Sequence, residues 1–130
     1  MGRKRASTEP GITGTYDIST GTAEVVPDEF RDGAYILNVN GVPSSHIVLG
    51  EPEELEFEYM RWIAAAVEHL NTRPSNKLRV THLGGAGCSL PRYFASRLPG
   101  SRHTGGELDA KLSGIGAYAF RRPPLLSLIH

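Results

Sequence analysis

The segment 83–87, Leu-Gly-Gly-Ala-Gly, contains the first residues of this sequence that could do chemistry. Where a glycine turn joins a strand to a helix, backbone amides can approach a ligand closely, and the helix N-terminus adds partial positive charge. About twenty positions further on, Glu107 stands where an acidic side chain can accept hydrogen bonds from both hydroxyls of a ribose, with Asp109 close behind. This spacing predicts a nucleoside site formed by Gly84, Gly85, Ala86, Gly87, Glu107 and Asp109.

The glycine turn lacks one feature of the dinucleotide fingerprint, because Leu90 stands where its third glycine would be. A single turn of this kind suits an adenosyl group attached to sulfur better than a dinucleotide, which has a pyrophosphate to bind. A structural interpretation stays open, in which the glycines only allow a tight turn and Glu107 is a solvated strand end.

No other group of residues has the spacing of a catalytic or metal site. The five histidines show no metal-ligand pattern, and Ser89 follows Gly-Cys instead of occupying the centre of Gly-x-Ser-x-Gly. Cys88 precedes an expected helix, which by itself is weak support for a reactive thiol. We therefore expect no metal and assign no catalytic residue.

The elements around the glycine turn are expected to form a βαβ unit of about thirty residues. Their ranges are a strand at Lys77–Leu83, a helix at Ser89–Leu98 that is capped by Ser89 with Pro91 in its first turn, and a parallel strand at Ser101–Asp109. Gly105 and Gly106 weaken the second strand. After Asp109, glycines interrupt the helical pattern and the segment 121–124, Arg-Arg-Pro-Pro, disfavours regular structure, so we expect no third strand.

A small antiparallel sheet is expected before this unit. Thr15–Ala23 indicates two weak strands around a Thr-Gly turn, the second reaching Val26. The strand Ala34–Val39 is followed by Asn-Gly at 40–41, which supplies the positive φ of a tight hairpin turn. The returning strand should run from Ser44 to Leu49, because Pro43 lacks an amide hydrogen and makes the strand begin late or lie at an edge.

A change of period then predicts a helix over Glu53–Leu70, with Pro52 and two glutamates suited to its start. Its buried face is expected to carry Leu55, Tyr59, Ile63, Val67 and Leu70, widened by Met60 and Trp62.

Length and composition indicate one α/β protein of modest size. We expect a flexible tail (1–14), an N-terminal β-hairpin domain (15–50) and an incomplete Rossmann-like nucleoside-binding domain (51–130).

The 130 residues carry 14 basic and 14 acidic side chains, which disfavours a nucleic-acid partner. The single cysteine and the lack of a long apolar run predict a cytoplasmic protein that does not enter a membrane.

Three segments carry a resemblance to a known family: Leu37–Ser45, Glu54–Trp62 and the run 78–94, LRVTHLGGAGCSLPRYF. With the order of elements over about Asp32 to Asp109, these motifs resemble spermidine synthase-like proteins, which are aminopropyltransferase relatives of the class I methyltransferases. In that family a small β-domain precedes a Rossmann-like domain of the S-adenosylmethionine (SAM) methyltransferase type, and decarboxylated SAM binds between the family's hairpin motif, glycine loop and acidic strand end.

The resemblance implies that Gly84, Gly85 and Gly87 line the adenosyl-binding loop, that Glu107 holds the ribose, and that SAM or its decarboxylated form is the substrate. Some motifs differ from the family pattern. The hairpin motif Leu-Asp-Gly-x-x-Gln is Val-Asn-Gly-Val-Pro-Ser over 39–44, and Asp-Glu-x-x-Tyr-His-Glu keeps only Glu56 and Tyr59. The family's glycine loop, Gly-Gly-Gly-Asp-Gly-Gly, is Gly-Gly-Ala-Gly-Cys-Ser over 84–89. The family's catalytic aspartate lies beyond the end of this sequence, so we expect a truncated chain without aminopropyl transfer of its own.

Two other functions remain open at this point. The same glycine loop serves methyl transfer, and the altered hairpin weakens the case for aminopropyl specificity, so a SAM-dependent methyltransferase-like enzyme is the first alternative. A non-catalytic binding or dimerisation module is the second, because the edge of an incomplete sheet favours self-association. The expected partners are a small-molecule nucleoside and a second copy in a homodimer.

Overall fold

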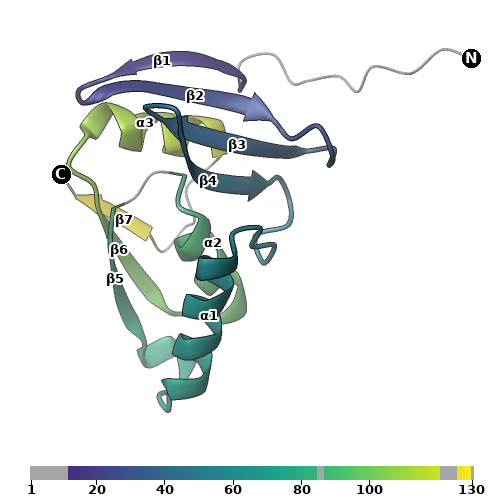
Figure 1. The fold of residues 1–130 in the computed structure, drawn as a ribbon. Coiled ribbons are helices and arrows are strands. Elements are labelled where there is room, and N and C mark those ends of the chain that lie inside the picture. Colours follow the sequence, from purple (N-terminus) through teal and green to yellow (C-terminus); the bar gives the residue numbers. More distant parts are fainter. Residues whose placement is uncertain (1–11, 85–86, 121–125, 130) are drawn as a thin grey trace, which may run out of the picture.

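The computed structural model describes residues 12–84, 87–120 and 126–129 and confirms an α/β fold (Figure 1). An antiparallel sheet comes first along the chain, and a parallel sheet with flanking helices follows. The elements are β1 (Gly14–Ile18), β2 (Gly21–Pro27), β3 (Ala34–Val39), β4 (Val42–Val48), α1 (Glu58–Leu70), a short 3₁₀ turn η1 (Ser75–Lys77), β5 (Arg79–Leu83), α2 (Ser89–Arg97), β6 (Arg102–Gly106), α3 (Ala110–Phe120) and β7 (Leu126–Ile129).

The antiparallel sheet has the strand order β1-β2-β3-β4, so each strand pairs with its neighbour in sequence. Asn40 and Gly41 form the turn between β3 and β4, with φ values of 51° and 78°. The Asn-Gly prediction is therefore confirmed, because a two-residue turn with positive φ at both central residues matches the twist of the two strands.

Strand β4 begins at Val42, two residues earlier than we predicted. Pro43 lies opposite Asn38, and the register shifts between Leu37 and Asn38. Because β4 is an edge strand, a residue without an amide hydrogen is tolerated here. The predicted edge position is correct, and the predicted late start is wrong.

Helix α1 begins at Glu58 instead of Glu53, and its buried face differs from the prediction. Met60 and Ala64 are buried, whereas the predicted core residues Tyr59, Ile63 and Leu70 are exposed and Trp62 is 66% exposed. The packed face is the row Met60, Ala64 and Glu68, one turn apart. Glu68 accepts hydrogen bonds from Tyr93 and Arg97 of α2, both at 3.0 Å. These bonds orient the row of Met60, Ala64 and Glu68 toward α2, in place of the predicted apolar face.

The parallel sheet has the strand order β5-β6-β7. Its third strand and the complete helix α3 correct our prediction that regular structure ends after Asp109. Glycines lower intrinsic helix propensity, but tertiary contacts override it here. Asp109 accepts hydrogen bonds from the first turn of α3, and Leu112 is buried against the antiparallel sheet. The backbone of β7 then pairs in parallel with β6.

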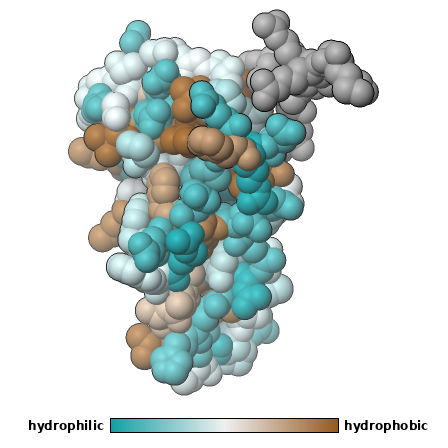
Figure 2. Space-filling view, turned by 45° about the vertical axis from the view of Figure 1, so that its right-hand side comes forward, coloured by the Kyte–Doolittle hydropathy of each residue, from teal (hydrophilic) through white to brown (hydrophobic). Residues whose placement is uncertain are grey.

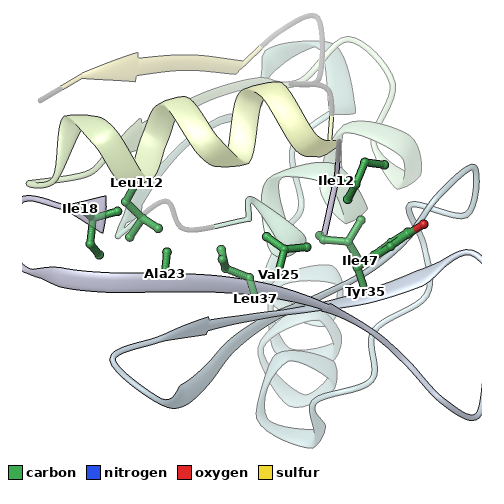
Figure 3. Packing of buried hydrophobic residues seen from close by; sticks show 8 residues of the cluster. All are labelled: Ile12, Ile18, Ala23, Val25, Tyr35, Leu37, Ile47 and Leu112. Atoms are coloured by element: carbon green, nitrogen blue, oxygen red, sulfur yellow. The ribbon is translucent and has the colours of Figure 1, made fainter. Parts of the chain in front are cut away.

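One hydrophobic core joins the inner face of the antiparallel sheet to α3 (Figure 3). Helix α3 lies between this sheet and the parallel strands, and Leu112 points from it toward Ile18 and Ala23 (Figures 1 and 3). The residues of the cluster are Ile12, Ile18, Ala23, Val25, Tyr35, Leu37, Ile47 and Leu112.

The surface combines polar and apolar patches. On the face shown in Figure 2, hydrophobic patches alternate with hydrophilic side chains. Within the described ranges, no helix is both long and apolar enough to cross a membrane.

A directed chain of hydrogen bonds crosses the parallel sheet beneath Phe94. Ser101 Oγ donates to the carbonyl of Leu98 at 2.6 Å, so it must accept from His103 Nε2 at 2.8 Å. His103 Nδ1 is then an acceptor for His82 Nε2–H at 3.0 Å. Both rings are neutral in this arrangement. Burial and the neighbouring His103 lower the pKa of His82 to about 4, and burial lowers the pKa of His103.

Acidification should therefore weaken the fold. Between pH 6.5 and 4 the unfolded chain binds more protons at residue 82 than the native state, so the stabilisation is complete above pH 6.5 and is lost as pH falls toward 4. Urea unfolding at pH 7.5 and pH 5 should show a loss of about 2 kcal/mol from His82. His82→Gln keeps a donor for His103 and should flatten this dependence, whereas the exposed His69→Gln should not. An unchanged pH dependence in His82→Gln would contradict the assignment.

Candidate functional site

The glycine turn and the acidic segment lie side by side at the carboxyl edge of the parallel sheet. In the pairing of β5 with β6, Leu83 lies opposite Gly106, and the amide of Gly84 donates to the carbonyl of Gly106 at 2.7 Å. Glu107 directly follows Gly106. The structure thus brings together Gly84 and Glu107, which the sequence separates by more than twenty residues.

Gly84 has the conformation and the free space that a ligand-binding turn requires. Its φ of +86° is in the left-handed region, which favours glycine, and a Cβ there would meet nothing within 4 Å. Gly85 and Ala86, which we also predicted to line the site, lie outside the described residues.

Gly87 is buried and serves packing between the two sheets. Its amide donates to Ser45 Oγ of β4 at 3.0 Å, and a Cβ at Gly87 would lie 2.8 Å from Ser45 Cβ. Only glycine permits this approach. Sequence reasoning did not find this role of Ser45, because a contact between residues 42 positions apart has no local pattern.

The start of α2 also differs from our prediction. Cys88, with a φ of 61°, is the N-cap residue, and Ser89 is the first residue of the helix. The predicted capping role of Ser89 is wrong, because its hydroxyl donates to the carbonyl of His46 in β4 at 3.2 Å. This bond secures α2 to the antiparallel sheet. The Cys88 thiol is buried.

Glu107 is half-buried at the end of β6, and its Oε1 accepts the amide of Asp109 at 3.1 Å. Apolar side chains flank the turn and the acid. Leu83 is 93% exposed and Leu108 is 90% exposed. An acidic group beside exposed apolar surface can receive a ligand that has both hydroxyl groups and a flat apolar face.

Asp109 is buried, and its carboxylate is used within the protein. Oδ2 accepts the amide and the hydroxyl of Thr20 at 2.9 and 3.0 Å, while Oδ1 accepts the amides of Lys111 and Leu112 at 3.1 and 3.2 Å. Burial raises its pKa, but these bonds and one from Ser19 outweigh that effect and hold it at about 2. Asp109 therefore caps α3 and fixes the β1–β2 turn, which spacing alone did not indicate.

Metal ligation has no candidate within the described ranges, where no group of three or more histidine, cysteine, aspartate or glutamate side chains could hold an ion.

These features place a glycine turn beside an acidic side chain on a partial Rossmann-like fold, and the chain can be compared with known proteins on that basis. No protein-family model and no curated protein matches the sequence. Among solved structures, the chain is similar to a probable spermidine synthase from Corynebacterium glutamicum ATCC 13032, with 42% sequence identity and a TM-score of 0.80. The match covers 90% of this chain and 43% of that chain. The chain is spermidine synthase-like over this length, which confirms the resemblance carried by its motifs.

Gly87→Ala tests the packing role of Gly87. The added methyl group should overlap Ser45 and lower the free energy of unfolding by about 1–3 kcal/mol in urea titrations. Ser45→Gly in the same chain should restore part of that loss. Gly114→Ala is the matched control, because its Cβ would enter open space on α3, and it should stabilise by about 0.5–1 kcal/mol. Equal stability of Gly87→Ala and the unmodified chain would sink the argument.

Asp109→Asn tests the cap. The amide keeps the shape but places a donor against backbone amides, so the urea midpoint at pH 7 should fall. Because the folded pKa lies below the ordinary 3.8, the stabilisation is present above about pH 4 and is lost as pH falls toward 2. Asp109→Asn should not show this loss of stability between pH 4 and pH 2, whereas the exposed Asp17→Asn should still show it. Acid unfolding followed by circular dichroism distinguishes these outcomes.

Proposed function

We propose that this chain binds a SAM-type nucleoside at the carboxyl edge of its parallel sheet. The observation that carries the proposal is the juxtaposition of Gly84, in an open left-handed turn, with Glu107. The likeness to a probable spermidine synthase supports the same ligand class.

In this proposal each described residue has one task. The Glu107 carboxylate accepts hydrogen bonds from the ribose hydroxyls, since an ionised carboxylate is an acceptor at both oxygens. Leu83 and Leu108 give the base an apolar surface, and Gly84 leaves room for the chain that carries the sulfonium. Decarboxylated SAM, the aminopropyl donor, is the first candidate ligand.

Aminopropyl transfer also requires a general base, because a protonated amine has no lone pair with which to attack carbon. Asp109 does not suit this role, since both of its oxygens already accept hydrogen bonds. We therefore propose nucleoside binding, and not complete aminopropyl transfer, as the activity of this chain. A cytoplasmic location stays a prediction and rests on the lone Cys88.

Methyl transfer is the second candidate function, and the hairpin favours it. Ser44 occupies the position of the family's glutamine, and its hydroxyl donates to the carbonyl of Val42 at 3.0 Å. A short side chain that is bonded to its own strand is a poor replacement for a glutamine that reaches a ligand. This altered hairpin would accept SAM, whose methionine part keeps its carboxylate, as readily as the decarboxylated form.

Calorimetric titration with decarboxylated SAM, SAM and methylthioadenosine tests the proposal. Saturable binding is expected, and Glu107→Gln should weaken it at least tenfold, or about 1.4 kcal/mol, through loss of the charged acceptor. Glutamine keeps a carbonyl oxygen for the Asp109 amide, so the turn should persist. Glu24→Gln, an exposed change on β2, should bind like the unmodified chain.

The preferred ligand then decides between the two candidate functions. Tighter binding of decarboxylated SAM favours a function related to aminopropyl transfer, and tighter binding of SAM favours methyl transfer. A folded chain that binds none of the three nucleosides would contradict the proposal and leave the non-catalytic module as the better hypothesis.

A further inference from the structure

One side of β5 is an open edge of the parallel sheet. Strand β5 comes first in the order β5-β6-β7, so one side pairs with β6, and no strand within the described ranges pairs with the other (Figure 1). Proteins commonly protect such edges with a proline, a bulge or a charged side chain. The edge strand β4 has Pro43 and a register shift against β3. Apart from Arg79 at its start, β5 has none of these features, because its register with β6 is regular throughout.

Hydrogen bonds at the two ends of β5 show which of its backbone groups face outward. Leu78, just before the strand, accepts the amide of Arg102 at 3.0 Å, and Gly84, just after it, donates to the carbonyl of Gly106 at 2.7 Å. In a regular parallel pair, every second residue directs both its amide and its carbonyl toward the partner strand. The residues of β5 that direct these groups away from β6 are Arg79, Thr81 and Leu83.

The same three residues also have exposed side chains, and Leu83 is 93% exposed. They share one face of the sheet, because alternate residues of a strand point to the same side. Among the described residues, no hydrogen bond uses their outward amides and carbonyls. A regular edge of this kind is a template for pairing with a strand of another chain.

The two ends of β5 differ in charge, which favours one direction for a second strand. Exposed Lys77 and Arg79 lie at the amino end, and Arg102 lies opposite Arg79 on β6. Glu107 lies at the carboxyl end of the same pair of strands. An antiparallel second copy would bring its basic end to the acidic end of the first, whereas a parallel copy would place the basic ends together.

We propose that two copies of this chain form a two-fold symmetric dimer through antiparallel pairing of β5, with Thr81 opposite the partner's Thr81. In this register Arg79 lies opposite the partner's Leu83 at each end of the strand. Each of the three resulting pairs exchanges two backbone hydrogen bonds. A shift by two residues would leave only two such pairs, so this register satisfies the largest number of outward backbone groups.

The side chains agree with this register. A threonine opposite a threonine is a favourable cross-strand pair, and the aliphatic part of Arg79 can cover the exposed side chain of the partner's Leu83. The two Arg79 side chains lie at opposite ends of the paired strands, so their charges do not oppose each other. A strand of five residues buries little surface compared with a stable dimer, and we therefore expect a weak dimer. The proposal does not depend on nucleoside binding.

Sedimentation velocity of the full chain from about 1 µM to 1 mM tests the pairing, and a monomer–dimer equilibrium is expected. Thr81→Pro removes an outward amide that β6 does not use, so it should weaken dimerisation about tenfold or more. Thr81→Val is the matched control, because it keeps the backbone groups and the branched side chain, and it should dimerise like the unmodified chain. Circular dichroism checks that each variant is folded.

Disulfide cross-linking tests the register and remains usable if Thr81→Pro does not fold. Paired residues of an antiparallel ladder have Cα atoms about 5.5 Å apart, which a disulfide can span. Thr81→Cys alone should form a covalent dimer under mild oxidation, and so should an equal mixture of Arg79→Cys and Leu83→Cys chains. Arg79→Cys alone should not, because its two copies would lie about 13 Å apart along the strands. The unmodified chain is the control for Cys88, which is buried.

Three results would each overturn the proposal. They are a chain that stays monomeric at about 1 mM, a dimer that Thr81→Pro does not weaken, and cross-linking of Arg79→Cys alone as fast as that of the mixture. A monomeric chain would leave the edge of β5 to a strand of a different protein. A dimer that Thr81→Pro does not weaken would form through another surface of this chain.

Discussion

The carboxylate of Asp109 joins the two halves of this molecule. One oxygen holds Thr20 in the β1–β2 turn, and the other holds the first turn of α3. Because α3 carries Leu112 into the core beneath the antiparallel sheet, the cap of one helix also determines how the two sheets pack. The amide of Asp109 in turn binds Glu107, so the proposed ribose-binding side chain is positioned by the same junction.

The two described glycines of the glycine loop have different surroundings. Gly84 is open, and a left-handed backbone lets the chain leave β5 beside the end of β6. Gly87 instead admits Ser45 from the antiparallel sheet, at a distance that no Cβ would permit. The sequence motif suggests a single ligand-binding loop. In the structure, Gly84 borders open space, whereas Gly87 packs against β4. Backbone hydrogen bonds hold these two glycines, from Gly84 to the carbonyl of Gly106 and from Gly87 to the Ser45 hydroxyl.

The buried histidines show how polar groups can be satisfied in different ways. His82 and His103 belong to a chain in which each donor has an acceptor, and the chain needs both rings neutral. His46 uses one nitrogen on Asp28, and its other ring nitrogen is buried without a hydrogen-bond partner among the described residues. A complete network stabilises a fold, whereas a buried polar atom without a partner costs stability.

The sequence by itself determined the local features: the Asn-Gly turn, the order of strand, glycine turn and helix, the family resemblance, and the pairing of glycine loop with Glu107. Each depends on residues close in sequence or on the general geometry of parallel strands. Tertiary structure decided the rest. The face of α1 follows Glu68 and its partners on α2, α3 forms despite its glycines because Asp109 and Leu112 hold it, and Ser45 and His46 meet α2 across more than forty residues. Such contacts leave no periodic signal, because they are set by which surfaces pack together.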